Sequence, residues 1–245
     1  MSENNVSSLL KKLTELKGDD QFKVTIPSRK AALSVTPLNL KQQKDIISSV
    51  ADGVAGMISF TRILNNIVID ATGDSTLKTY DRAPVTVALR VNALGTDYKD
   101  DDKAINLADV VKKFEKAKHT LKDEDSVEHN GIKVNVRVPT LLDENLLIKK
   151  LEEEIKRNGE NNTKNLGSIY VYEIAKFIKS IEFDGQVVEY ADQKMKDKID
   201  IIEGLPLILN KKVIAFIEQF RKEERENLTV DDVVVEINPG FFDTE

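Results

Sequence analysis

The densest group of residues able to do chemistry is an acidic run over residues 97–102, which contains four aspartates and could be joined by Glu124 or Asp125. Carboxylates that converge on a divalent cation support metal-dependent nuclease or phosphotransferase chemistry. The run does not fit a calcium-binding EF-hand, because it has no glycine at the sixth position from Asp97 and no closing glutamate. Acidic runs are more often solvated, so we predict an exposed loop over residues 95–103 and keep the metal-dependent enzyme as the alternative.

The remaining polar groups resemble catalytic sites less closely. Glu152, Glu153 and Glu154 are consecutive on a predicted helix, so their side chains point in different directions. His119 and His129 lack partner ligands at metal-binding spacing and are predicted to be surface residues. Cysteine is absent, which excludes disulfides, thiolate zinc sites and cysteine nucleophiles. We therefore predict no catalytic residue, no metal site and no cofactor.

Composition places the chain among globular proteins. Of its 245 residues 40% are hydrophobic, and the net charge of -6 comes from 36 basic and 42 acidic residues that are mostly interspersed. No broad basic field results, which argues against nucleic acid as a partner. The longest apolar stretch, over residues 50–69, is interrupted by charged and amide side chains. We expect a soluble protein that does not enter a membrane.

The elements that must position these residues alternate between helical and strand patterns. The first half is predicted to contain a short helix, a hairpin and two longer helical stretches, over residues 6–16, 22–35, 39–71 and 79–93. Gly53 and Gly56 weaken the third pattern, which therefore allows two helices. The residues of the fourth stretch do not distinguish a helix from a strand. Its β-branched side chains favour a strand, whereas Pro84 near its start suits the first turn of a helix.

The second half shows the same alternation. It is predicted to contain hairpins over residues 127–138 and 181–190, helices over 105–121, 140–159, 169–180, 192–203 and 209–225, and a strand over 230–237. Charge rises and periodicity weakens between residues 95 and 125. We predict a helix-rich α+β fold with short antiparallel hairpins and two closely associated modules, residues 1–104 and 105–245.

Two apolar features near the C-terminus are candidates for contacts with a partner protein. They are one face of the last helix and the end of the terminal strand, comprising Val213, Phe216, Ile217, Phe220, Phe241 and Phe242. Apolar helix faces and strand edges dock partners by packing and by β-augmentation. Apolar residues at helical spacing more often complete the chain's own core. The sequence leaves both interpretations open.

Several segments occur in an order that points to a known family. They are VTIPSRKAALSVTPLNLKQQKDI, YDRAPVTVALRVNALG, IKVNVRVPTLLDENLL, SIYVYEIAKFIKSIEF and IIEGLPLILNKKVIAFIEQF with a terminal GFFD, and they span residues 22–243. The series resembles the baseplate hub and hub-assembly proteins of T4-like contractile-tailed bacteriophages. Asp81, Arg82, Leu89 and Arg90 resemble a helical element of that family and favour a helix over the ambiguous fourth stretch. Some relatives carry a cysteine-rich insertion, which this chain lacks, so no metal-stapled subdomain is implied.

The resemblance implies a protein that helps to build the central hub of a phage tail baseplate. It would be either a hub subunit that stays in the virion or an assembly factor that acts in the host cytoplasm and leaves. Its partners would be other hub or tail proteins, and the family has no catalytic residues to carry over. Homo-oligomerisation stays open, since no heptad seam specifies a copy number. The second alternative is a phage regulator with no role in tails.

Overall fold

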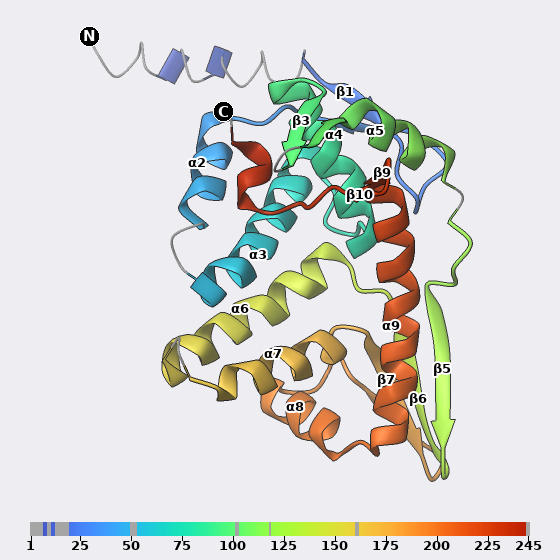
Figure 1. Cartoon of the computed structure of the whole chain (residues 1–245). Coiled ribbons are helices and arrows are strands. Elements are labelled where there is room, and N and C mark those ends of the chain that lie inside the picture. The colour runs from blue at the N-terminus through green and yellow to red at the C-terminus, as the bar shows by residue number, and fades with distance from the viewer. Residues whose placement is uncertain are drawn as a thin grey trace.

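The computed structural model describes residues 20–49, 53–100, 103–117, 119–159 and 162–243, together with 7–8 and 11–12. The helix predicted over residues 6–16 therefore falls largely outside the described residues. Figure 1 shows a chain built mainly of helices with short antiparallel strand pairs, which confirms the predicted helix-rich α+β class. Among the described helices, none has the length and hydropathy needed to span a bilayer.

The first half follows the predicted order of elements. Its elements are β1 (Phe22–Val24), β2 (Leu33–Val35), α2 (Leu40–Ser49), α3 (Gly53–Thr72), η2 (Thr79–Asp81), α4 (Arg82–Leu94), β3 (Asp97–Asp100), β4 (Lys103–Asn106) and α5 (Leu107–Lys116). Strands β1 and β2 pair antiparallel, as the hairpin prediction required. The long helical pattern is divided into α2 and α3, and the ambiguous stretch is helical in α4.

The prediction of a loop over residues 95–103 is wrong, although Asp97 and Lys99 are exposed as predicted. Strands β3 and β4 pair antiparallel there, with Tyr98 opposite Ile105. Ile105 is buried, and the Tyr98 ring meets that of Phe241 at 5.2 Å between centroids. These two side chains anchor an otherwise polar hairpin to the core. Because Ile105 belongs to a strand, the next helix begins later than predicted, after Asn106, whose Oδ1 accepts a hydrogen bond from the backbone N–H of Ala108 at 2.9 Å.

The second half contains the main sheet and the longest helix. Its elements are β5 (Glu124–His129), β6 (Ile132–Arg137), α6 (Leu141–Asn158), α7 (Lys164–Ala175), β7 (Ile178–Phe183), β8 (Gln186–Glu189), α8 (Met195–Gly204) and α9 (Leu207–Leu228). The four strands form one antiparallel sheet in the order β5-β6-β7-β8. Both predicted hairpins are present, and positive φ angles at Asn130, Gly131, Asp184 and Gly185 give their turns the geometry that matches sheet twist.

Besides smaller shifts of element ends, the structure differs from the prediction over two stretches of this half. The helix predicted over residues 169–180 ends at Ala175, because Ile178 and Ile181 pair with Val136 and Val134 of β6 and are buried in the sheet. The strand predicted over residues 230–237 is also interrupted. Instead β9 (Thr229–Val230) and β10 (Val233–Val234) form a minimal hairpin, followed by the 3₁₀ turn η3 (Pro239–Phe242). Asp231 and Asp232 adopt positive φ angles of 47° and 62°, which turn the chain back on itself.

The buried side chains form two main cores. The first core lies among α2, α3, α4, α5 and the β1-β2 hairpin, and it also takes Leu228, Phe241 and Phe242 from the end of the chain. The second core lies between the four-stranded sheet and helices α7, α8 and α9. In Figure 1, α9 runs along the molecule from the turns of the sheet toward the first core. The division into modules at residue 104 stays a prediction, and the first core contains residues from both sides of it.

Candidate functional site

The six residues predicted to dock a partner all lie inside the chain. Val213, Phe216, Ile217 and Phe220 belong to the second core and Phe241 and Phe242 to the first, with exposed fractions from 0% to 7%. The Phe216 and Phe220 rings meet edge to face at 5.1 Å, and the carbonyl oxygen of Phe241 accepts a hydrogen bond from Arg90 Nε at 3.0 Å. This burial favours the interpretation that they complete the core. Docking through these side chains stays a prediction.

The acidic residues considered for metal chemistry lie on two separate hairpins. Strand β3 holds Asp97 and Asp100, whereas Glu124 and Asp125 begin β5 in the main sheet. Glu124 pairs with Lys179 Nζ at 2.6 Å. Within the described ranges, which leave out residues 101–102, no group of three or more acidic or histidine residues could hold a metal ion. The described part of the chain thus adds nothing in favour of the metal-dependent alternative.

His129 is half-buried, so the predicted surface position is wrong for it, and the same holds for His119. His119 Nδ1 lies 3.2 Å from Glu223 Oε1, and its Nε2 lies 3.2 Å from Asp123 Oδ1. The ring stacks on Tyr80 at 4.4 Å, and the Tyr80 hydroxyl donates to Asp123 at 3.0 Å. Burial and the nearby Asp123 charge raise the pKa of Tyr80. Because carboxylates occupy both ring nitrogens, the arrangement joins α9 to the segment before β5 rather than activating a nucleophile.

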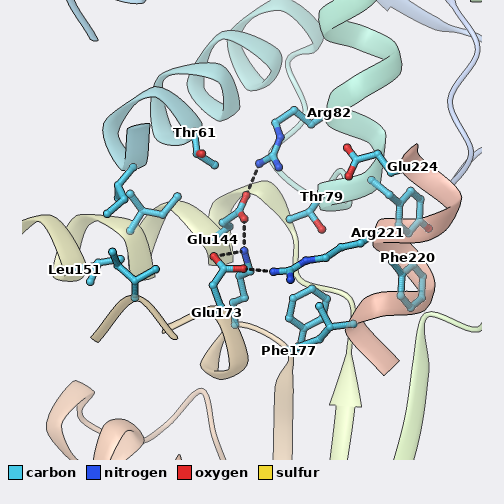
Figure 2. Close-up of a pocket in the computed structure, with 16 residues that line it drawn as sticks. Thr61, Thr79, Arg82, Glu144, Leu151, Glu173, Phe177, Phe220, Arg221 and Glu224 are labelled. Carbon is cyan, nitrogen blue, oxygen red and sulfur yellow. Dashed lines mark hydrogen bonds and ion pairs between the residues drawn. The ribbon is translucent and has the colours of Figure 1, made fainter. Parts of the chain in front are cut away.

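A cavity of about 280 Å³ lies where α3, α4, α6, α7 and α9 meet, and we call it the charged pocket. Its charged lining residues are Arg82, Glu144, Glu173, Lys176, Arg221 and Glu224. Figure 2 shows Arg82, Glu144, Glu173 and Arg221 following one another across the cavity, with dashed lines marking their contacts. Three cationic and three anionic side chains therefore line one cavity, and Arg221 lies at its exposed edge.

Glu144 is the centre of the charged pocket. Its side chain is 2% exposed, and it pairs with Arg82 Nη1 at 2.5 Å and with Lys176 Nζ at 2.8 Å. Asn65 Nδ2 donates a further hydrogen bond to it at 2.9 Å. Burial alone would raise the pKa of Glu144, but the charges of Arg82 and Lys176 outweigh burial and hold this pKa well below its usual range. Glu144 is therefore ionised and fully partnered.

The other carboxylates of the charged pocket differ in their partners. Glu173 pairs with Lys176 at 3.0 Å and with Arg221 at 2.6 Å, which connects α7 to α9. Glu224 is half-buried and makes no hydrogen bond or ion pair with the described residues. Burial raises the pKa of Glu224, although the Arg82 charge acts in the opposite direction. The ion pairs of Glu144 and Glu173 with cations of other elements suit structural cross-linking of the helices.

Sequence reasoning missed Glu144, although the sequence carried a signal. On α6 the buried stripe is formed by Leu141, Glu144, Ile148, Leu151 and Ile155, at alternating spacings of three and four residues. A carboxylate in the middle of an apolar stripe must find cationic partners when the helix packs. The stripe could therefore have indicated a buried ion pair, but not Arg82 or Lys176 as the partners, because both are distant in the sequence.

A second cavity, of about 450 Å³, opens at the turns of the main sheet. We call it the distal groove. Its lining residues are Asn130, Gly131, Ile132, Ile181, Phe183, Asp184, Val188, Asp200, Ile201, Gly204, Leu205 and Pro206. Figure 1 shows these turns and the first turn of α9 at the end of the molecule opposite to η3.

Strand register explains why the distal groove is apolar. Ile132 lies opposite Phe183, and Ile181 lies opposite Val188, so the four side chains share the face of the sheet that forms the second core. Ile181 is buried, but Phe183 is 38% exposed. The corner between α8 and α9 at Pro206 thus leaves the last rows of the sheet partly uncovered. The groove is an open continuation of the second core.

The sequence model of the family described as T4 bacteriophage base plate protein matches residues 20–230, which is most of the chain. No curated protein sequence and no solved structure matches this chain. The matched region contains the charged pocket, the distal groove and the whole main sheet. On this match, the chain belongs to the T4 bacteriophage base plate protein family.

Proposed function

We propose that this chain is a structural subunit or assembly factor of the baseplate hub and that it acts by docking to other tail proteins. The observation that carries the proposal is the family match over residues 20–230. The role is non-enzymatic, and its partners are proteins rather than nucleic acid or membrane. It acts in the host cytoplasm during assembly and remains in the tail if it is a subunit.

Exposed apolar side chains on two helices support a docking role. On α6, Leu142 and Leu146 are 47% and 60% exposed, and on α7, Leu166 and Tyr170 are 68% and 51% exposed. Each pair is separated by four residues and therefore shares one helix face. Such pairs are surfaces that a neighbouring subunit can cover. The six buried residues predicted for docking would act indirectly, by holding these helices in place.

Affinity purification of the tagged chain from phage-infected cells tests the proposal. Mass spectrometry should find hub or tail proteins in amounts far above those from a parallel infection without the tag. An immunoblot of purified virions then separates the two roles, because a subunit is retained and an assembly factor is not. Recovery of no tail protein would contradict the proposal and favour the regulator. The same preparation on a sizing column gives the copy number.

A further inference from the structure

The charged residues that line the distal groove are both acidic. Asp184 and Asp200 are its charged lining residues, and both are exposed. Neither forms a hydrogen bond or an ion pair with the described residues. They thus differ from Glu144, whose charge is neutralised inside the chain. A partner that reaches the groove meets apolar side chains at its floor and uncompensated negative charge at its edge.

The floor offers an apolar side chain a place to bury. Phe183 is 38% exposed, and Ile132, Val188 and Ile201 are half-buried. Beyond Pro206, Leu207 and Ile208 are 66% and 44% exposed and extend the apolar surface along the chain. A cavity of about 450 Å³ lies within the size range of sites that enclose a compact ligand, so it can accept a large side chain.

We propose that the distal groove docks a segment of another baseplate protein that presents a large apolar side chain flanked by lysine or arginine. The proposal rests on the proposed function and specifies its partner. The apolar side chain covers the uncovered rows of the sheet, and the flanking cations pair with Asp184 and Asp200. A second copy of this chain fits less well. A two-fold contact at the groove would place the aspartates of both copies together, in a chain of net charge -6.

Peptide binding to the purified full chain tests this recognition directly. The probes are short fluorescent peptides with a phenylalanine flanked by lysines, the same peptide with glutamates in place of the lysines, and the lysine peptide with serine in place of the phenylalanine. Fluorescence anisotropy should show that the first binds about tenfold tighter than either control. Its advantage over the glutamate peptide should fall as salt is raised. Equal binding of the three peptides would overturn the proposal.

Variants of the groove identify the site of binding. The double variant Asp184→Asn/Asp200→Asn should weaken binding of the lysine peptide about threefold to tenfold. Asparagine tolerates the positive φ at position 184, so the turn is kept. Phe183→Ser should weaken binding about tenfold.

Matched control variants lie away from the groove. Glu115→Gln/Glu236→Gln also removes two exposed charges, and Ile47→Ser also removes an exposed apolar side chain. Both controls should bind the lysine peptide as the unaltered chain does. Equal losses in the groove variants and in their controls would mean that the peptide binds elsewhere, and the proposal would fail.

A photo-crosslinker identifies the natural partner. Benzoylphenylalanine at position 208, beside the groove, is introduced into the tagged chain in infected cells, and the crosslinked segment is sequenced. A segment of another tail protein with an apolar residue flanked by lysine or arginine supports the proposal. A segment of a second copy, a segment without that pattern, or no crosslink although tail proteins co-purify overturns it and leaves the proposed function standing. Absence of tail proteins altogether overturns the proposed function itself.

Discussion

The charged pocket and the distal groove are cavities of the same chain with opposite relations to their surroundings. In the charged pocket, Glu144 and Glu173 are paired with cations from other helices. In the distal groove, Asp184 and Asp200 have no partner among the described residues and stand beside partly exposed apolar side chains. Clustered charges alone therefore do not indicate where a protein binds. It is more informative to ask whether the chain itself pairs the charged groups of a cavity and buries its apolar side chains.

The largest expected loss of stability comes from removing the central carboxylate of the charged pocket. Replacing Glu144 by alanine leaves the half-buried cations Arg82 and Lys176 without their shared, buried carboxylate. Removal of one member of a buried ion pair typically costs about 3–5 kcal/mol of unfolding free energy. Urea denaturation at neutral pH measures this loss. Glu153→Ala is the control, because Glu153 pairs with Lys150 in solvent, and it should leave the transition midpoint unchanged.

The same variant should lose its effect in acid. The pKa of Glu144 is lower in the folded chain than in the unfolded chain, because Arg82 and Lys176 outweigh burial. Its stabilisation is complete above the unfolded value of about 4.3 and is lost as the pH falls toward the folded value. The difference between the unaltered chain and Glu144→Ala should therefore shrink below about pH 4. A difference that stays constant with pH would contradict a charge-based role.

The next largest loss of stability is expected at Phe241, where it distinguishes a core residue from a docking residue. Phe241 is fully buried in the first core against Tyr98. Phe241→Ala should cost about 3 kcal/mol, since it leaves a cavity among packed side chains. Thermal unfolding of the purified chain measures this cost without any partner present. A variant of unchanged stability that nevertheless fails to recover tail proteins would restore the docking interpretation of this residue.

Local patterns in the sequence predicted much of this fold because turns and helix caps depend on residues close together in the chain. Asn130-Gly131 and Asp184-Gly185 fix the turns of the main sheet, and Thr140 caps α6 through its hydroxyl. The β3-β4 hairpin was missed because its apolar contacts with the core come from Tyr98 and Ile105 in an otherwise polar stretch. Phe241, which the Tyr98 ring meets, is distant in the sequence.

The candidate sites were harder to predict than the elements. The spacing of Phe216 and Phe220 showed an apolar helix face but not the sheet that covers it. The distal groove depends on how far β6 and β7 extend past the corner at Pro206, which is a property of tertiary packing alone. An apolar pattern therefore predicts burial, whereas the part of that surface left open is known only once the chain is folded.

A smaller effect is expected at the groove. Phe183 is 38% exposed, so Phe183→Ser should cost only about 1–2 kcal/mol, less than the alanine replacement of Phe241. Urea denaturation of both variants in one buffer tests this order. A loss at Phe183 as large as that at Phe241 would show that the groove is part of the closed core. The contrast between the open distal groove and the charged pocket, whose central charges are paired within the chain, would then not hold.

The smallest expected effect concerns Glu224, the carboxylate of the charged pocket that most resembles the aspartates of the groove. It has no hydrogen-bond or ion-pair partner among the described residues, and burial raises its pKa. A raised folded-state pKa means that ionised Glu224 destabilises the folded chain above that pKa, and that the penalty is absent below the unfolded pKa. Glu224→Gln should therefore raise stability at pH 7 by about 0.5–1 kcal/mol.

Thermal unfolding at two pH values decides whether this gain comes from charge. Well below the unfolded pKa of about 4.3, where the glutamate is protonated in both states, the variant and the unaltered chain should unfold together. A gain that persists in acid would point to a shape effect of the amide. A loss of stability at pH 7 would show that Glu224 is held by Arg82 after all, so that every carboxylate of the charged pocket is satisfied within the chain and the contrast with the groove is sharper than the contacts alone indicate.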